Sequence, residues 1–219
     1  RIEKKKCYLF YKPKGCVCTS ARDNAPRVVD YFSNIGYRLF TVGRLDKDSE
    51  GLILVTNDGE LAQKLAHPKY EIEKVYRVTL RGPIDPETVE KIRKGIWLSE
   101  GKTVPTKIKV IKTSMTSSIV EVVLTEGKKR AVRRIFAKVG HPVSNLLRIR
   151  FGTFTIDTLK AGKYRPVMEE EIQETLSLRN REKKEKFDRR SRNGEEKPGF
   201  PPRRQGHRQE RKEKIGRAH

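Results

Sequence analysis

The chain has 219 residues, and its 35% hydrophobic content is enough for one or two small globular domains. Its 50 Lys and Arg against 28 Asp and Glu give a formal net charge of +22, which favours nucleic acid over an anionic membrane surface as the partner. No segment approaches the roughly 18 apolar residues that span a bilayer, and residues 1–6 lead into no signal-like apolar run. We therefore expect a cytoplasmic protein without a membrane partner.

Three cysteines, Cys7, Cys16 and Cys18, lie near one end of the chain. Their odd number does not suggest a disulfide framework and fits a reducing compartment. A Cys-x-Cys pair could bind zinc, but a zinc site normally needs four ligands. The four scattered histidines supply no recognisable second half, so we expect no metal site.

Short β-rich runs alternate with a few helical patterns along the chain. The first helix is expected to follow Asn57 and to end before Pro68, the second is capped by Asp85 and ends at Gly95, and the third occupies residues 131–139. The runs predicted as strands are Cys7–Lys12, Leu39–Val42, Leu52–Thr56, Lys74–Arg81, Lys107–Thr113, Ser118–Thr125 and Leu146–Phe154.

Strands dominate these elements, and their hairpin-like spacing predicts a mainly antiparallel sheet with helices packed on one side, which is an α+β fold. We assign residues 1–178 to one folded domain, with a weak boundary between Arg81 and Gly82 that divides it into two sheet halves. Residues 179–219 contain 16 Lys and Arg, seven Asp and Glu and almost no aliphatic residues, so we predict a disordered basic tail. The folded domain still keeps a net charge of +13.

The segment at residues 40–65 is the most informative for chemistry. An apolar strand leads into Gly43-Arg44-Leu45-Asp46, and a polar turn then leads into a second apolar strand. The cations on either side, Arg44 and Lys47, favour the ionised form of the Asp46 carboxylate, which suits a nucleophile. The alternative is that Asp46 only ends a strand and bonds the amides of a turn, as most aspartates in loops do.

Here the sequence resembles the pseudouridine synthases, specifically the RsuA family that acts on ribosomal RNA. The resemblance covers about residues 7–165 and comes in four blocks that follow the family's order. The blocks are YKPKGCVCTS at 11–20, GRLDKDSEGLILVTNDGELAQKLAHP at 43–68, EKVYRVTL at 73–80 and EGKKRAVRRIFAKVGHPVSNLLRIRFG at 126–152.

The resemblance implies the family's mixed, mainly antiparallel bent sheet and a cofactor-independent isomerisation of uridine to pseudouridine. Asp46 then corresponds to the essential catalytic aspartate, and Tyr76 to the tyrosine that stacks on the target uracil. Arg133 corresponds to the basic residue that pairs with the catalytic aspartate. Without the resemblance, Tyr76 would be read as sheet packing and Arg133 as one more charge on a solvated helix face.

One departure from the family concerns the third helix. Relatives usually carry Gln where this chain has Ala131, so an amide contact in the pocket is absent or is supplied by another group. Arg133 and Arg134 are adjacent and point about 100° apart on a helix, so only one of them can face the site. The motif position selects Arg133.

The resemblance also gives expectations for RNA binding. Arg44 occupies the position of an arginine that fills the gap left by the extruded nucleotide. Many members of the family carry a small S4-type RNA-binding domain, which would lie upstream of residue 1. The candidates for phosphate contacts are Lys12, Lys14, Lys128, Lys129 and Arg130.

The leading hypothesis is therefore a monomeric pseudouridine synthase that acts on ribosomal RNA, with transfer RNA as the lesser alternative and with no cofactor or obligate protein partner. A second hypothesis is a catalytically silent RNA-binding or ribosome-assembly factor on the same scaffold. A basic ribosomal or DNA-binding protein is a third reading, but no helix-turn-helix or zinc-finger spacing supports binding to DNA.

Overall fold

The structure is a computed structural model that describes residues 3–19, 24–156 and 159–178. All of these residues belong to the first of two structural units, which spans Arg1–Glu182. The predicted basic tail at 179–219 and any upstream domain lie outside the described residues. In the described part of the chain, no helix is long and apolar enough to cross a membrane.

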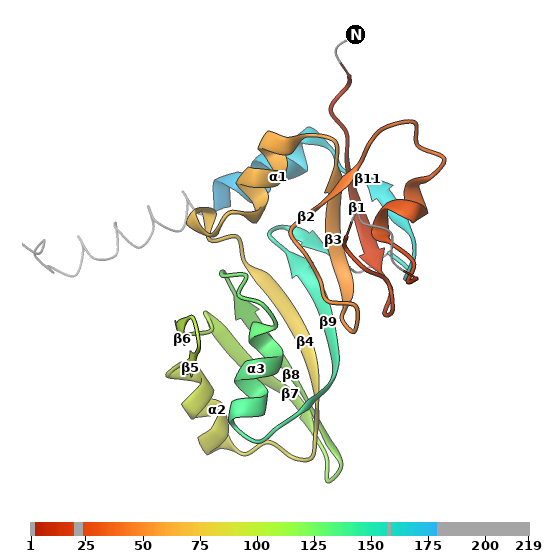
Figure 1. The fold of residues 1–219 in the computed structure, drawn as a ribbon. Helices are drawn as coiled ribbons and strands as arrows, with labels where there is room; N and C mark the ends of the chain where they lie inside the picture. The colour runs from red at the N-terminus through yellow and green to blue at the C-terminus, as the bar shows by residue number, and fades with distance from the viewer. Residues whose placement is uncertain (1–2, 20–23, 157–158, 179–219) are drawn as a thin grey trace, which may run out of the picture. The chain divides into compact units, whose positions relative to one another are not determined.

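A nine-stranded sheet is the frame of this unit, in the order β11-β1-β3-β9-β4-β8-β7, with β2 paired to β3 and β10 to β9 (Figure 1). Every pairing is antiparallel except β3 with β9. The mainly antiparallel α+β fold is thus confirmed. The strands are β1 (Cys7–Lys12), β2 (Phe40–Val42), β3 (Glu50–Thr56), β4 (Lys74–Arg81), β7 (Lys107–Thr113), β8 (Ser117–Leu124), β9 (Val143–Phe151), β10 (Phe154–Thr155) and β11 (Tyr164–Pro166), and β5 (Ile96–Leu98) and β6 (Gly101–Thr103) form a separate hairpin.

The three predicted helices are present as α1 (Gly59–Ala66), α2 (Pro86–Arg93) and α3 (Ala131–Lys138). α1 follows Asn57 and ends before Pro68 as expected, and its N-cap is Asp58, which accepts hydrogen bonds from the backbone N–H groups of the first turn. Asp85 caps α2 as expected, and its carboxylate accepts from the backbone of Thr88 at 2.7 Å. Residues 169–178 form a further helix, and Val28–Phe32 and Pro68–Tyr70 form 3₁₀ turns.

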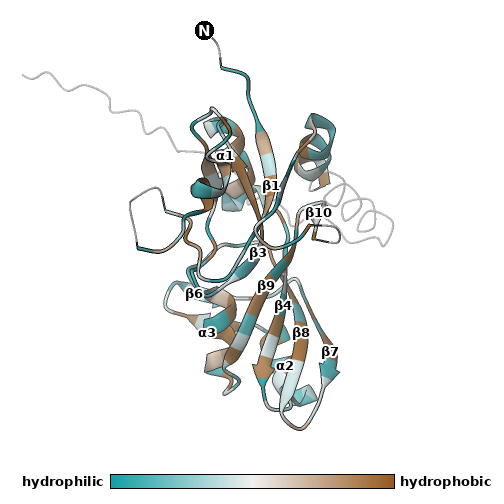
Figure 2. Ribbon diagram, turned by 90° about the vertical axis from the view of Figure 1, so that its right-hand side faces the viewer, coloured by the Kyte–Doolittle hydropathy of each residue, from teal (hydrophilic) through white to brown (hydrophobic). Residues whose placement is uncertain are grey.

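Three apolar clusters hold these elements together. The largest lies between α2, α3 and the strands β4 and β8, along which hydrophobic residues recur (Figure 2). A second cluster joins β1 and β3 to α1 and to the helix at 169–178, and a third joins β1 and β3 to the segment that precedes β3. β4 pairs with β8 and β9, both of which follow residue 82, and the predicted boundary between residues 81 and 82 stays a prediction.

The contact between β3 and β9 is short and leaves no room for a side chain at Gly51. They pair for two residues only, Glu50 with Leu147 and Gly51 with Arg148. Gly51 has a φ of +111°, and a Cβ atom at this position would lie 2.3 Å from the carbonyl oxygen of Arg148 and 2.6 Å from its nitrogen. Only glycine combines this backbone conformation with this lack of volume.

Replacing Gly51 with alanine should therefore separate the two strands or strain both of them. We expect Gly51→Ala to lower the free energy of unfolding by about 2 kcal/mol or more. Chemical denaturation followed by circular dichroism measures this loss. Gly59→Ala is the matched control, since Gly59 begins α1 with open space around it, and it should be neutral or stabilising. Equal stabilities for the two variants would show that the contact between β3 and β9 does not require glycine at position 51.

Candidate active site

Asp46 lies on the loop that joins β2 to β3, and core contacts on both sides fix this loop. Leu45, the preceding residue, is 8% exposed and packs in the third apolar cluster. Its backbone N–H donates to the Sγ atom of Cys18 at 3.4 Å. The carbonyl of Asp46 accepts a hydrogen bond from the backbone of Ser49 at 3.0 Å, which closes the turn. The Asp46 carboxylate is thus held, half-exposed, on an ordered turn.

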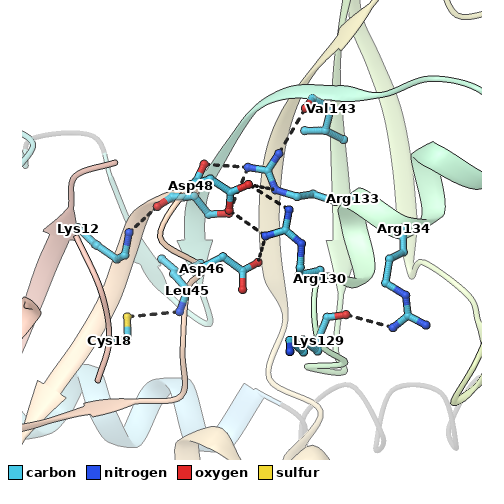
Figure 3. A network of polar contacts seen from close by, with 11 residues as sticks. Lys12, Cys18, Leu45, Asp46, Asp48, Lys129, Arg130, Arg133, Arg134 and Val143 are labelled. Carbon is cyan, nitrogen blue, oxygen red and sulfur yellow. Dashed lines mark hydrogen bonds and ion pairs between the residues drawn. The ribbon is translucent and has the colours of Figure 1, made fainter. Parts of the chain in front are cut away.

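Two arginines near the start of α3 reach this loop (Figure 3). Arg130 lies 3.4 Å from a carboxylate oxygen of Asp46 and 3.0 Å from one of Asp48. Arg133 lies 3.3 Å from the other carboxylate oxygen of Asp48 and donates to the carbonyl of the same residue at 2.8 Å. The hydrogen bonds from Arg130 and the positive charges of both arginines hold the pKa of Asp48 below its usual range.

The position of Arg133 differs from the expected one. It was expected to pair with Asp46, but among the described residues the ion pair of Asp46 is with Arg130, whereas Arg133 pairs with Asp48. The reason is that Arg133 also donates to the carbonyl of Val143 at 3.3 Å, so its guanidinium spans from the loop to β9. Arg134 points elsewhere and pairs with Glu100 at 2.7 Å, as expected for a neighbour on a helix.

Asp46 lines a cavity of about 490 Å³, a size typical of sites for small organic groups. Tyr76, on β4, lines the same cavity and is half-buried. Arg44 enters it from the loop, and Lys129 and Arg130 enter it from the segment before α3. The structure therefore brings Asp46 and Tyr76, 30 positions apart in sequence, into one cavity with a cationic rim.

Not every predicted RNA contact faces solvent. Lys12 is fully buried and donates to the carbonyls of Ser49 at 2.6 Å and Pro13 at 3.1 Å. The expected phosphate contact for Lys12 is therefore wrong, because its ammonium is buried against the loop that carries Asp46. Lys14 is exposed, so it stays a candidate for a phosphate contact.

The three predicted RNA contacts before α3 differ in their exposure and in their partners. Lys129 is exposed, whereas Lys128 pairs with Glu126 at 3.0 Å and donates to the Thr103 hydroxyl at 3.0 Å. Lys128 thus ties this segment to the β5–β6 hairpin. Arg130 is half-exposed but already engaged by the two aspartates.

Two further cations line the cavity and were not predicted as site residues. They are Lys74, at the start of β4, and Arg148, on β9. Lys74 precedes Tyr76 by two positions, so the alternation of side chains along a strand puts both on one face. That signal was available in the sequence, whereas the position of Arg148 depends on the pairing of β9 with β4 and β3.

The cysteines lie apart from any ligand set. All three are free, and burial raises the pKa of the Cys7 thiol to about 12 and that of Cys16 to about 11. Within the described ranges, no group of three or more His, Cys, Asp and Glu side chains is placed to hold a metal ion.

Comparisons with known proteins agree with the resemblance. The family described as RNA pseudouridylate synthase matches residues 6–138, more than half of the chain. The ribosomal large subunit pseudouridine synthase B of Bacillus subtilis is 40% identical over 174 residues, which cover 78% of this chain and 71% of that protein. The ribosomal small subunit pseudouridine synthase A of Escherichia coli is 37% identical over 169 residues, which cover 75% and 71%.

The fold is similar as well. A crystal structure of a pseudouridylate synthase superposes with a TM-score of 0.72 at 32% identity, covering 80% of this chain and 75% of that one. The family match at residues 6–138 includes both β4 and α3, which carry residues that line the cavity. The chain belongs to the RNA pseudouridine synthases, and within them to the RsuA-type family.

Proposed function

We propose that this enzyme converts a specific uridine of ribosomal RNA into pseudouridine, with Asp46 as the catalytic carboxylate and without a cofactor. The observation that carries the proposal is the Asp46 carboxylate in a nucleotide-sized cavity with Tyr76 and a cationic rim. The names of the two relatives described above support ribosomal RNA as the substrate, ahead of transfer RNA. We expect a cytoplasmic monomer that needs no obligate protein partner.

The reaction moves the uracil ring from an N1 to a C5 attachment on the ribose. It involves no net redox change and no hydrolysis, so its stoichiometry requires neither a nucleotide nor a flavin. An ionised Asp46 can attack C1′ or remove a proton from C2′, and either route needs the carboxylate beside the ribose. The ion pair with Arg130 at 3.4 Å orients this carboxylate.

A target uridine must leave its stack to reach this cavity, at a cost of a few kcal/mol. Tyr76 offers a half-buried ring on which the extruded uracil can stack. Arg44 is exposed on the loop beside Asp46 and is placed to fill the gap in the RNA. Lys14 and Lys129, both exposed, supply phosphate contacts that position the RNA without reading its sequence.

The competing function is a silent RNA-binding or assembly factor, which would need the positive charge but not the carboxylate. Asp46→Asn separates the two functions because it removes the charge and keeps the shape. We expect at least about a thousandfold less pseudouridine, with the dissociation constant for RNA within about threefold of wild type.

The measurement uses protein-free ribosomal RNA and partly assembled ribosomal particles. New pseudouridines are mapped by primer extension after carbodiimide treatment. Asp85→Asn is the control, since asparagine also caps a helix, and it should leave product formation unchanged. Pseudouridine formation by Asp46→Asn at the wild-type rate would overturn the catalytic role of Asp46.

A second prediction concerns Arg133, which we regard as a positioning residue. Lysine cannot contact the Asp48 carboxylate, the Asp48 carbonyl and the Val143 carbonyl together, because it lacks the planar fork of arginine. Arg133→Lys should slow the single-turnover rate by about tenfold or more, with little change in RNA affinity.

Arg134→Lys is the adjacent control, because Arg134 binds Glu100 and Ser99 outside the cavity. We expect its rate to stay within about twofold of wild type. Equal losses of activity in the two lysine variants would show that Arg133 has no specific positioning role. Melting temperatures for both variants show whether a lost rate reflects unfolding.

A further inference from the structure

Two buried cations, Lys74 and Arg148, line the cavity that contains Asp46, and we call this pair the cationic floor. Lys74 is 8% exposed and Arg148 is 3% exposed. Both contact the ring of Phe151, with the Lys74 Nζ atom 5.5 Å and the Arg148 Cζ atom 5.3 Å from its centroid. Arg148 pairs with Tyr76 across β9 and β4, so the floor lies directly beside the tyrosine.

The hydrogen bonds of the cationic floor are incomplete. The Lys74 ammonium donates to the carbonyls of Ile72 at 3.0 Å and Thr125 at 3.3 Å, which leaves one of its three N–H donors unused. The Nε atom of Arg148 donates to the carbonyl of Leu52 at 2.6 Å, but its buried Nη2 atom has no hydrogen-bond partner. Each cation therefore retains donor capacity.

The positive charge of the cationic floor is also uncompensated. Within the described residues, neither cation has an ion pair with a carboxylate, and Glu126, which lines the same cavity, is paired with Lys128. Burial, together with the charge of Arg148, lowers the pKa of Lys74 to about 8. Buried unpaired charges are costly, and proteins usually pair them or use them to bind a ligand of opposite charge.

We propose that Lys74 and Arg148 bind the exocyclic oxygens of the extruded uracil and stabilise the ring as an anion while it is detached from the ribose. This inference rests on the proposed function and adds to it the residues that stabilise the negative charge of the detached uracil. Lys74 is then a catalytic residue, because its free N–H group contacts the substrate. Arg148 supplies the second positive charge.

The chemistry of the isomerisation calls for such a group. The C1′–N1 bond breaks with both electrons passing to N1, and the ring becomes an anion whose charge is shared by N1, O2 and O4. C5 then bonds to C1′ and loses its proton, and N1 gains one, so no atom or electron is added overall. Preorganised cations stabilise such charge most strongly where water is excluded.

A phosphate of the RNA could also bind two cations, but the depth of the cationic floor favours the uracil. Backbone phosphates stay near the surface of the RNA, and the exposed Arg44 and Lys129 at the rim are available to them. The floor residues are almost fully buried, and only an extruded base can extend that far into the cavity.

The test compares Lys74→Met, Lys74→Arg and wild type in single turnover, from about pH 6 to about pH 9.5, reading kcat/KM for pseudouridine formation. Lys74→Met should be about 100-fold slower at neutral pH, with an unchanged dissociation constant for RNA. Lys91→Met, on the exposed face of α2, controls for the loss of one positive charge and should react at the wild-type rate.

The pH profile separates a catalytic role from a structural one. The Lys74 charge is present below a pH of about 8 and is lost above it, so wild-type kcat/KM should fall as the pH rises through about 8. Arginine stays charged, so Lys74→Arg should lack this fall. The other charged groups that line the cavity are Arg44, Asp46, the Lys128–Glu126 pair, Lys129, Arg130 and Arg148, which all the variants share.

Several results would overturn the inference. One is an unchanged rate in Lys74→Met. Another is a fall of kcat/KM at alkaline pH in Lys74→Arg that equals the fall in wild type. The second comparison can be made even if Lys74→Met fails to fold. Weaker RNA binding with an unchanged single-turnover rate would assign the floor to a phosphate instead. A wild-type protein that makes no pseudouridine would overturn the proposed function itself, which distinguishes the two failures.

Discussion

β3 and β9 run side by side for only two residue pairs, and this short parallel contact joins the two antiparallel parts of the sheet. On one side of it, β3 continues from the loop that carries Asp46. On the other side, β9 pairs with β4, which carries Tyr76, and follows α3, which carries Arg133. The absence of a side chain at Gly51 permits the contact, so the distance between the two halves of the active site depends on one glycine.

Asp48 holds the two arginines that lie beside Asp46. Its carboxylate pairs with both Arg130 and Arg133, so it offsets one of their two positive charges before any substrate binds. Arg130 then contacts Asp46 at 3.4 Å with a guanidinium that is already held in place. A carboxylate with a single partner at this distance keeps lone pairs free for a ligand, which a fully paired one does not. The second aspartate thereby orients the cations around the first.

The sequence predicted the local features well because they depend on local patterns. β1, β4 and β7 begin and end as expected, and the Asp85 cap was identified from the residue types alone. Features that depend on tertiary contacts were missed. The β5–β6 hairpin and β11 have three-residue strands with too few positions for an alternating pattern. Lys12 resembled a surface cation in a basic sequence, and only the folded chain shows the Ser49 carbonyl that it binds.

The cations around the cavity lie at different depths, and their exposure to water and their charge partners change with depth. At the rim, Arg44 and Lys129 are exposed, so water screens their charge and they attract RNA at little cost to folding. Below the rim, Arg130 and Arg133 are paired with Asp48, and Arg130 is also paired with Asp46. In the floor, the partners of Lys74 and Arg148 within the described ranges are carbonyl groups and an aromatic ring, so none of these partners neutralises their charge. If the floor binds the base as proposed, charge that develops on the base is stabilised most strongly there, because burial strengthens the interaction with both cations.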